Sequence, residues 1–205
     1  ATFREVEQII TGKPEPVVSQ FNATYATLLN LYTQFQDDLL TIYPKSFHHF
    51  QASKKGRKRA LHALRMKLSL LKEAEYIVNG TLSDKGRFAS HMYGYELLLS
   101  EMLAEGFLEE VSTTELLMLL IALVFEPRKR DHTPEYDKQT NKLIDAVMPF
   151  AKRVTKLERS YKIFPPTKRP FFHLSDAIKY WSRGEAFQDL FDYTTSDEGE
   201  LVRYF

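Results

Sequence analysis

Apolar residues recur at helical spacing through the first third of the chain. Spacings of three, four and seven residues put each series on one face of a helix, so the pattern predicts three amphipathic helices. Pro44 lies inside the second series, where it predicts a late helix start or a kink. The series are Phe21, Tyr25, Leu28, Leu29 and Tyr32; Leu39, Leu40, Tyr43, Phe47 and Phe50; and Ala60, Leu61, Leu64, Leu68 and Leu71.

The pattern changes at residues 76–82, where two short apolar pieces flank Asn79-Gly80. Asn-Gly is the strongest short signal for a β-hairpin, because both turn residues must adopt a positive φ. Helices followed by one small hairpin predict a winged-helix arrangement.

Helical spacing returns after the hairpin. We expect helices over residues 85–93, 95–105 and 113–125, with Ser112 and Glu115 as a capping box at the start of the third. The second and third of these helices are apolar on most sides, so they should lie at the centre of a bundle.

Prolines, a serine and a glycine predict the limits of two later helices. A long helix should open with Pro134 in its first turn, bend at Pro149 and end at Pro165-Pro166. Ser175 should then cap a shorter helix, which Gly184 should end.

The chain stops about two turns into a last helix, which Thr195 and Glu198 should open as a capping box. A helix this short is marginal unless it packs on something, and the chain starts without Met. We therefore interpret the sequence as a piece of a longer protein. Its expected fold is mainly α: a winged-helix subdomain with one small β-hairpin, followed by a helical bundle.

The composition is that of a globular protein, with 205 residues, 43% hydrophobic and 27% charged. There is no Cys, which excludes disulfides and thiolate zinc sites and suits a reducing compartment. The densest apolar run, residues 116–125, is too short to cross a bilayer. These features predict a cytoplasmic protein without membrane contact.

The net charge of +1 hides a strong local bias. Residues 54–72 carry eight Lys and Arg side chains and no acidic one, and residues 151–170 carry seven, with Glu158 as the only acid. Segregated charge of this kind can steer an anionic polymer to one face. An ordinary solvated surface is the alternative, and the sequence leaves both interpretations open.

The sequence lacks the motifs of a catalytic machine. Gly12-Lys13 superficially resembles a phosphate-binding loop, but the upstream glycine is missing and Pro14 stands where Ser or Thr should bind magnesium. The six histidines show no zinc-binding spacing, and no Ser lies in a nucleophile elbow. We predict no catalytic residue, metal site or cofactor in this chain. A catalytic pair of carboxylates that are distant in sequence and close in space would not be visible in the sequence.

Three separated stretches carry a family resemblance. The first is residues 10–21, and the second combines Tyr76-Ile77, Lys85-Gly86-Arg87 and Glu96-Leu97-Leu98-Leu99. The third contains Trp181, Arg183-Gly184, Phe187, Leu190, Glu198-Gly199 and Leu201-Val202-Arg203. In this order and spacing they resemble the C-terminal region of the superkiller-type DExH-box RNA helicases of superfamily two, where a winged helix is followed by a helical bundle of the ratchet type.

The resemblance implies a division of the chain. Residues 1–16 would be the exit segment from a missing ATPase lobe, residues 17–88 a winged-helix-like subdomain, and residues 89–205 the helical bundle, truncated at its C-terminus. ATP and magnesium would bind to the ATPase lobes of the parent, an ATP-dependent RNA helicase and hydrolase. The partners would be those lobes and single-stranded RNA, with DNA as an alternative, and the protein would be a monomer.

The resemblance also selects the candidate binding residues. Arg203 matches the family's arginine in the last helix and is the first candidate for a strand contact, while the basic cluster before the third helix would contact backbone phosphate or form a solvated linker. Lys85 and Arg87 would bind nucleic acid or hold the wing against the bundle. We expect Trp181 in the core rather than as a stacking platform. The nucleic-acid-binding candidates are Arg203, Lys54, Lys55, Arg57, Lys58, Arg59, Lys85 and Arg87.

Two other functional classes stay open. A winged-helix module that regulates transcription would bind duplex DNA through a recognition helix over residues 58–72. A protein-docking scaffold would bury its basic faces against a partner. Salt-dependent binding to single-stranded RNA, compared with duplex DNA, separates the helicase region from the regulator, and no binding to either at low ionic strength favours the scaffold.

Overall fold

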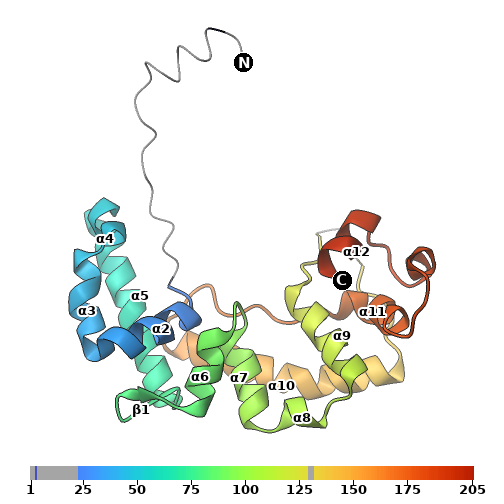
Figure 1. Cartoon of the computed structure of the whole chain (residues 1–205), viewed down its shortest axis with the longest axis horizontal. Coiled ribbons are helices and arrows are strands. Elements are labelled where there is room, and N and C mark those ends of the chain that lie inside the picture. The colour runs from blue at the N-terminus through green and yellow to red at the C-terminus, as the bar shows by residue number, and fades with distance from the viewer. Residues whose placement is uncertain (1–2, 4–22, 129–131) are drawn as a thin grey trace.

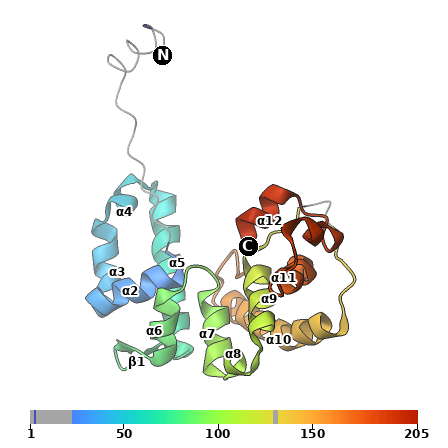
Figure 2. The same ribbon diagram turned by 45° about the vertical axis from the view of Figure 1, so that its right-hand side comes forward.

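The computed structural model describes residues 3, 23–128 and 132–205. Two arms rise from a common base: an N-terminal arm of α2 to α5 and a C-terminal arm of α9, α11 and α12, with α10 along the base (Figures 1 and 2). The α-helices are α2 (Tyr25–Phe35), α3 (Leu39–Ile42), α4 (Phe47–Gln51), α5 (Lys54–Glu73), α6 (Asp84–His91), α7 (Glu96–Ala104), α8 (Phe107–Glu110), α9 (Thr113–Val124), α10 (Lys138–Ser160), α11 (Ser175–Trp181) and α12 (Glu198–Tyr204). The 3₁₀ turns are η1 (Gln36–Asp38), η2 (Tyr43–Lys45), η3 (Phe172–Leu174) and η4 (Phe187–Asp192), and the strands are β1 (Ile77–Val78) and β2 (Thr81–Leu82).

The predicted fold class is confirmed, because the described residues are mainly helical and contain one antiparallel hairpin. Ile77 pairs with Leu82 and Val78 with Thr81, and the two turn residues between the strands have φ of 51° and 77°, as the Asn-Gly signal predicts. One cluster of buried apolar side chains includes members from both arms and from the base. No helix in the described parts of the chain has the length and apolar run that a bilayer crossing requires.

The division at residues 17–88 and 89–205 stays a prediction. The exit segment over residues 1–16, apart from Phe3, lies outside the described residues, and so do the stretch 10–21 and Phe21.

The second predicted helix is broken. The backbone forms α3, then η2 with Pro44 inside it, then α4, whose N-cap Ser46 accepts a hydrogen bond from the His49 amide. Pro44 has no amide hydrogen, and the Ser46 side chain offers a new helix start two residues later. One helix with a kink is therefore the wrong description of this stretch.

The expected central position of two helices is largely confirmed. Leu98 and Met102 of α7 and Leu119 of α9 are fully buried, whereas Leu120 and Val124 leave one side of α9 exposed. The capping box that was predicted at the start of α9 is present, with both of its hydrogen bonds.

Two predicted helix starts are wrong. The long helix begins after Asp137, whose side chain accepts from the Thr140 amide, and Pro134 precedes it in extended chain. Ser175 does not cap α11, because η3 already gives its backbone helical angles and its hydroxyl is buried. The long helix also ends earlier than predicted, at Ser160.

The predicted start of the last helix is wrong as well. Asp197 caps α12 by accepting from the Glu200 amide, so Thr195 and Glu198 do not form the expected capping box. Aspartate is a stronger N-cap than threonine, which explains the later start. Gly184 follows the end of α11 with φ of 94°, as a residue that ends a helix often does.

A buried lysine joins the base to the C-terminal arm. Lys179 of α11 is 4% exposed, and its Nζ donates to Asp137 Oδ2 at 2.6 Å and to Asp176 Oδ1 at 2.7 Å. The hydrogen bond from Lys179, followed by the one from the Thr140 amide, lowers the pKa of Asp137 to about 2. Its charged form is thus preferred in the folded chain.

This pair predicts part of the acid sensitivity of the protein. Because the pKa of Asp137 is lower in the folded than in the unfolded chain, its contribution to stability is complete above about pH 4 and lost as the pH falls toward 2. In urea unfolding from pH 7 to pH 2, Asp137→Asn should cost about 1 kcal/mol at pH 7, since the half-exposed carboxylate is screened, and should flatten the decline below pH 4. Asp145→Asn, at an exposed position of the same helix, should leave the profile unchanged. Equal profiles for the wild type and Asp137→Asn would contradict the assignment.

Candidate nucleic-acid interface

Arg203 lies on the exposed side of α12, about 200° around the helix from the fully buried Leu201. It lines a hollow of about 550 Å³ between α12 and the end of α9, together with Val124, Arg128 and Glu200. Its guanidinium is therefore accessible over a concave surface, as a strand contact requires. The contact itself stays a prediction.

The carboxylates beside Arg203 already have partners. Arg128 Nη2 lies 3.1 Å from Asp197 Oδ2 and 2.7 Å from Glu200 Oε1. The Glu200 amide, and then Arg128, lower the pKa of Asp197. Within the described residues Arg203 forms no ion pair of its own, so its charge is available to an anion.

Trp181 lies at the edge of the same arm and not in the core. It is 42% exposed, so the expected core position is wrong. Ala177 and Ile178 occupy the buried side of α11, which leaves Trp181 to pack against Phe205 with ring centroids 5.3 Å apart. The partly exposed indole offers a flat surface for stacking, and it packs beside the end of α12, the helix that carries Arg203.

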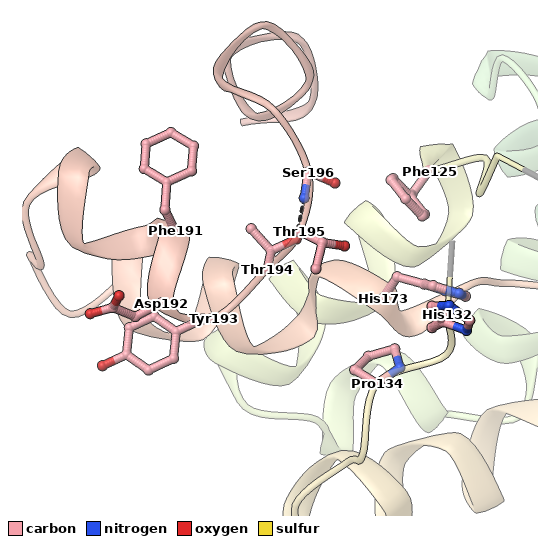
Figure 3. A pocket seen from close by; sticks show the side chains of 10 residues that line it. All are labelled: Phe125, His132, Pro134, His173, Phe191, Asp192, Tyr193, Thr194, Thr195 and Ser196. Atoms are coloured by element: carbon pink, nitrogen blue, oxygen red, sulfur yellow. Dashed lines mark hydrogen bonds between the residues drawn. The ribbon is translucent and has the colours of Figure 1, made fainter. Parts of the chain in front are cut away.

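A second hollow of about 540 Å³ lies beside the segment that leads into α12 (Figure 3). Phe125 forms its aromatic wall and lies 5.5 Å from the His173 ring and 5.4 Å from the Tyr204 ring, centroid to centroid. Thr194 and Ser196 line it with polar groups, and the Ser196 amide donates to Thr194 Oγ1 at 3.1 Å. Aromatic surface beside hydroxyl groups suits a flat ligand such as a nucleobase.

The N-terminal basic cluster lies near the tip of the N-terminal arm, where α4 meets α5 (Figure 1). Arg57 has a structural role there: its Nε and Nη2 donate to the carbonyls of Ala52 and Phe50 at 2.9 and 2.6 Å. The other four members are exposed and form no ion pair within the described residues: Lys54, Lys55, Lys58 and Arg59. The structure does not bring this cluster together with Arg203, which belongs to the other arm.

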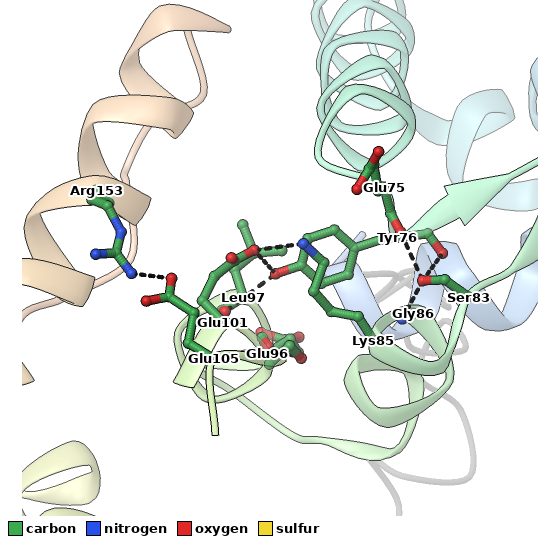
Figure 4. Close-up of polar contacts among 11 residues, drawn as sticks. Glu75, Tyr76, Ser83, Lys85, Gly86, Glu96, Leu97, Glu101, Glu105 and Arg153 are labelled. Carbon is green, nitrogen blue, oxygen red and sulfur yellow. Dashed lines mark hydrogen bonds and ion pairs between the residues drawn. The ribbon is translucent and has the colours of Figure 1, made fainter. Parts of the chain in front are cut away.

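Lys85 is held inside the molecule (Figure 4). Its side chain is 18% exposed, and its Nζ lies 3.1 Å from Glu101 Oε1 and 4.4 Å from the centre of the Tyr76 ring. The Tyr76 hydroxyl donates to Glu101 Oε1 at 2.7 Å, so hairpin and α7 are joined through one carboxylate. These contacts favour the structural alternative for Lys85, and a role in binding stays a prediction.

Arg87 also has internal partners. Its Nη1 donates to the Leu82 carbonyl at 3.0 Å, and its Nη2 pairs with Asp84. The side chain is well exposed and still presents one edge to solvent. It fastens the end of β2 to the start of α6, a local structural role; whether it binds nucleic acid or holds the wing against the bundle stays a prediction.

The sequence analysis named no binding residue within the basic stretch of residues 151–170. The seven cations of residues 151–170 were a visible signal, but nothing in the sequence showed which of them share a side. The structure places five of them around one groove of about 540 Å³ between α10 and the segment that follows it: Lys152, Lys156, Arg159, Lys168 and Arg169. Among the described residues no group of His, Asp or Glu side chains is arranged to hold a metal ion.

Comparison with known proteins gives a consistent set of matches. Residues 79–205 match the family described as DSHCT (NUC185) domain. The antiviral helicase SKI2 of Saccharomyces cerevisiae is 28% identical over 156 residues, which cover 67% of this chain and 11% of that protein. The exosome RNA helicases MTR4 of Mus musculus and Homo sapiens are each 28% identical over 154 residues, covering 73% of this chain and 14% of those proteins. The chain thus spans about a seventh or less of the length of these relatives.

Proposed function

The chain belongs to the DSHCT (NUC185) domain family, and from this premise we propose that it is an accessory, non-catalytic region of an ATP-dependent RNA helicase that guides single-stranded nucleic acid. The resemblance to the superkiller-type helicases inferred from the sequence is confirmed by this family and by its helicase relatives. By this proposal, ATP and magnesium are bound by ATPase lobes elsewhere in a longer protein, and this chain packs on those lobes.

The observation that carries the proposal is the setting of Arg203. An exposed arginine over a hollow, with the neighbouring carboxylates already paired to Arg128, can contact a phosphate without first breaking an ion pair. The partly exposed indole of Trp181, which packs on Phe205 at the end of α12, would supply the aromatic element that single-strand binding needs. RNA is the first choice of nucleic acid, because the MTR4 relatives are named as RNA helicases.

Exposed apolar side chains near Arg203 support the packing on ATPase lobes. Leu120 is 42% exposed, Val124 55% and Val202 67%, all on α9 and α12. Apolar surface of this kind is usually covered by a partner when it is contiguous. We propose that the lobes cover it and thereby place Arg203 beside the strand that leaves them.

The first test is strand binding by Arg203→Ala. Anisotropy titration of a labelled single-stranded RNA should show about fivefold weaker binding, and the plot of log affinity against log salt should flatten by about 0.7, because one phosphate contact is lost. Arg65→Ala is the matched control, since Arg65 is an exposed arginine on the other arm.

The same two variants separate the proposal from the regulator reading. If α5 were a recognition helix, duplex DNA would bind more tightly than single-stranded RNA, and Arg65→Ala would be the weaker binder. Equal affinities of the two variants for RNA would remove Arg203 from the binding site. Absence of binding to either nucleic acid at low salt would favour the protein-docking scaffold.

A further inference from the structure

The groove between α10 and the segment of residues 162–171 is a strongly cationic concave surface. It holds about 540 Å³ and has an apolar floor that includes Met148 and Ala151. Lys152, Lys156 and Arg159 line it from α10, and the following segment adds two more cations. In Figure 1 this segment runs back above α10 across the base, between the two arms.

The cations of α10 form a row. Lys152, Lys156 and Arg159 are spaced by four and three residues, so they lie on one side of the helix at intervals of about 5–6 Å. All three are exposed, and none forms an ion pair within the described residues. On the opposite wall Arg169 lies over the Phe171 ring at 5.2 Å. A row of point charges fits a polymer with regularly spaced anions better than it fits a single small anion.

The only acidic residue of this basic stretch faces inward. Glu158 is 2% exposed and accepts hydrogen bonds from the Tyr25 hydroxyl at 3.0 Å, the Thr167 amide at 2.6 Å and the Thr167 hydroxyl at 2.9 Å. Its carboxylate is therefore hydrogen-bonded inside the molecule and is not presented on the surface of the groove. The bonds to Thr167 hold the second wall of the groove against α10, so the same residue removes negative charge from the surface and shapes the hollow.

An ion pair links the lining of the groove to the lining of the Arg203 hollow. Lys168, on the groove wall, pairs with Glu126, and Glu126 lines the Arg203 hollow. The carboxylate between the two sites is thus neutralised by a groove residue.

We propose that this groove binds the phosphate backbone of single-stranded RNA, as a second contact after Arg203. The choice of RNA as the ligand rests on the proposed function; the anionic, repeating character of the ligand comes from the groove itself. Arg203 and Trp181 then supply a local contact with the strand, whereas the groove supplies most of the electrostatic affinity.

The test is a charge-matched pair of triple variants of the 205-residue chain. The first removes the row: Lys152→Ala, Lys156→Ala and Arg159→Ala. The second removes two lysines and one arginine at exposed positions away from the groove: Lys45→Ala, Arg65→Ala and Lys138→Ala. Both should keep the wild-type circular dichroism and melting temperature, because all six side chains are exposed.

Binding of a labelled single-stranded RNA is then measured over a range of salt concentrations. The row variant should bind at least tenfold more weakly, and its salt slope should fall by about 2, which is three contacts at about 0.7 each. The control triple should change both quantities much less. Equal losses in the two triples would overturn the inference, because they would show an effect of total charge only.

Two further results decide between the inference and the proposed function. If the row variant binds RNA with wild-type affinity while Arg203→Ala binds more weakly, the inference about the groove is overturned and the proposed function stands. If the row variant binds RNA more weakly while Arg203→Ala keeps wild-type affinity, the groove is supported as a binding site and Arg203 is removed from it. Displacement of RNA by polyglutamate as efficiently as by unlabelled RNA of equal charge would overturn RNA as the ligand.

Discussion

Replacing Gly86 by alanine is expected to lower the free energy of unfolding by about 4 kcal/mol, enough to unfold much of a marginally stable chain. A Cβ at this position would lie 2.0 Å from the Tyr76 carbonyl oxygen and 3.0 Å from its carbon. Both atoms belong to the backbone, so a side-chain rotation cannot relieve the overlap. The hairpin would have to move away from α6.

Urea unfolding followed by circular dichroism measures this effect. Gly199→Ala is the matched control, because a Cβ there meets only Asp197 Oδ1, at 3.4 Å, in another short helix. That variant should be as stable as the wild type or slightly more so, since alanine is the better helix former. Similar losses for both variants would show that the contact with Tyr76 is not the cause.

The expected cost is high because Tyr76 joins several elements (Figure 4). Its carbonyl accepts from the Ser83 amide at 3.1 Å, and its hydroxyl donates to Glu101 and to the Leu97 carbonyl. Burial, and then Glu101, raise the pKa of Tyr76, so the hydroxyl keeps its proton. The hairpin, the start of α6 and α7 are therefore linked through Tyr76.

This arrangement gives a physical meaning to the Lys85-Gly86-Arg87 motif. Lys85 joins the wing to α7, Gly86 permits the close approach of the hairpin backbone, and Arg87 holds the end of β2. From the sequence these cations were equally good binding candidates. The contacts with Glu101 and with the Leu82 carbonyl favour the structural reading, and no spacing along the chain contains them. The binding role stays a prediction.

Features that depend on neighbouring residues could be predicted from the sequence. The Asn79-Gly80 turn and the capping box of α9 are set by four or five consecutive residues, and both are present. Where two local signals compete, either the stronger cap or the tertiary packing decides. Ser175 is a good cap by type, but η3 precedes it and buries its hydroxyl, and Asp197 takes the place predicted for Thr195.

The candidate site shows the same limit. The charge bias of residues 151–170 was visible, but the sequence does not tell which cations are already paired. Arg153 pairs with Glu105 on another side of α10, whereas Lys152 and Lys156 face the groove. The Trp181 position was misjudged because burial of an aromatic residue depends on which side of a short helix packs, and Ile178 takes that side.

Glu158→Leu should lower the free energy of unfolding by about 3 kcal/mol, because one buried and two partly buried hydrogen bonds lose their acceptor. Burial, and then the charge of Glu158, raise the pKa of Tyr25, so its hydroxyl is a donor that would be left without this partner. Glu158→Gln keeps one acceptor oxygen and should cost about half as much. Asp145→Leu, which replaces an exposed acid of the same helix, should change stability by less than about 0.5 kcal/mol.

Whether Glu158→Leu weakens or strengthens RNA binding shows whether the shape of the groove or only its net charge matters. Removal of a negative charge from a basic region would by itself strengthen binding of an anion. However, Glu158 is buried and holds Thr167, and with it the wall that carries Lys168 and Arg169. If the groove binds RNA as a shaped site, the folded variant should bind more weakly and lose salt dependence, whereas Asp145→Leu should bind as well as the wild type or better. Tighter binding by Glu158→Leu, measured below its unfolding transition, would mean that the anion responds to net charge and not to the groove.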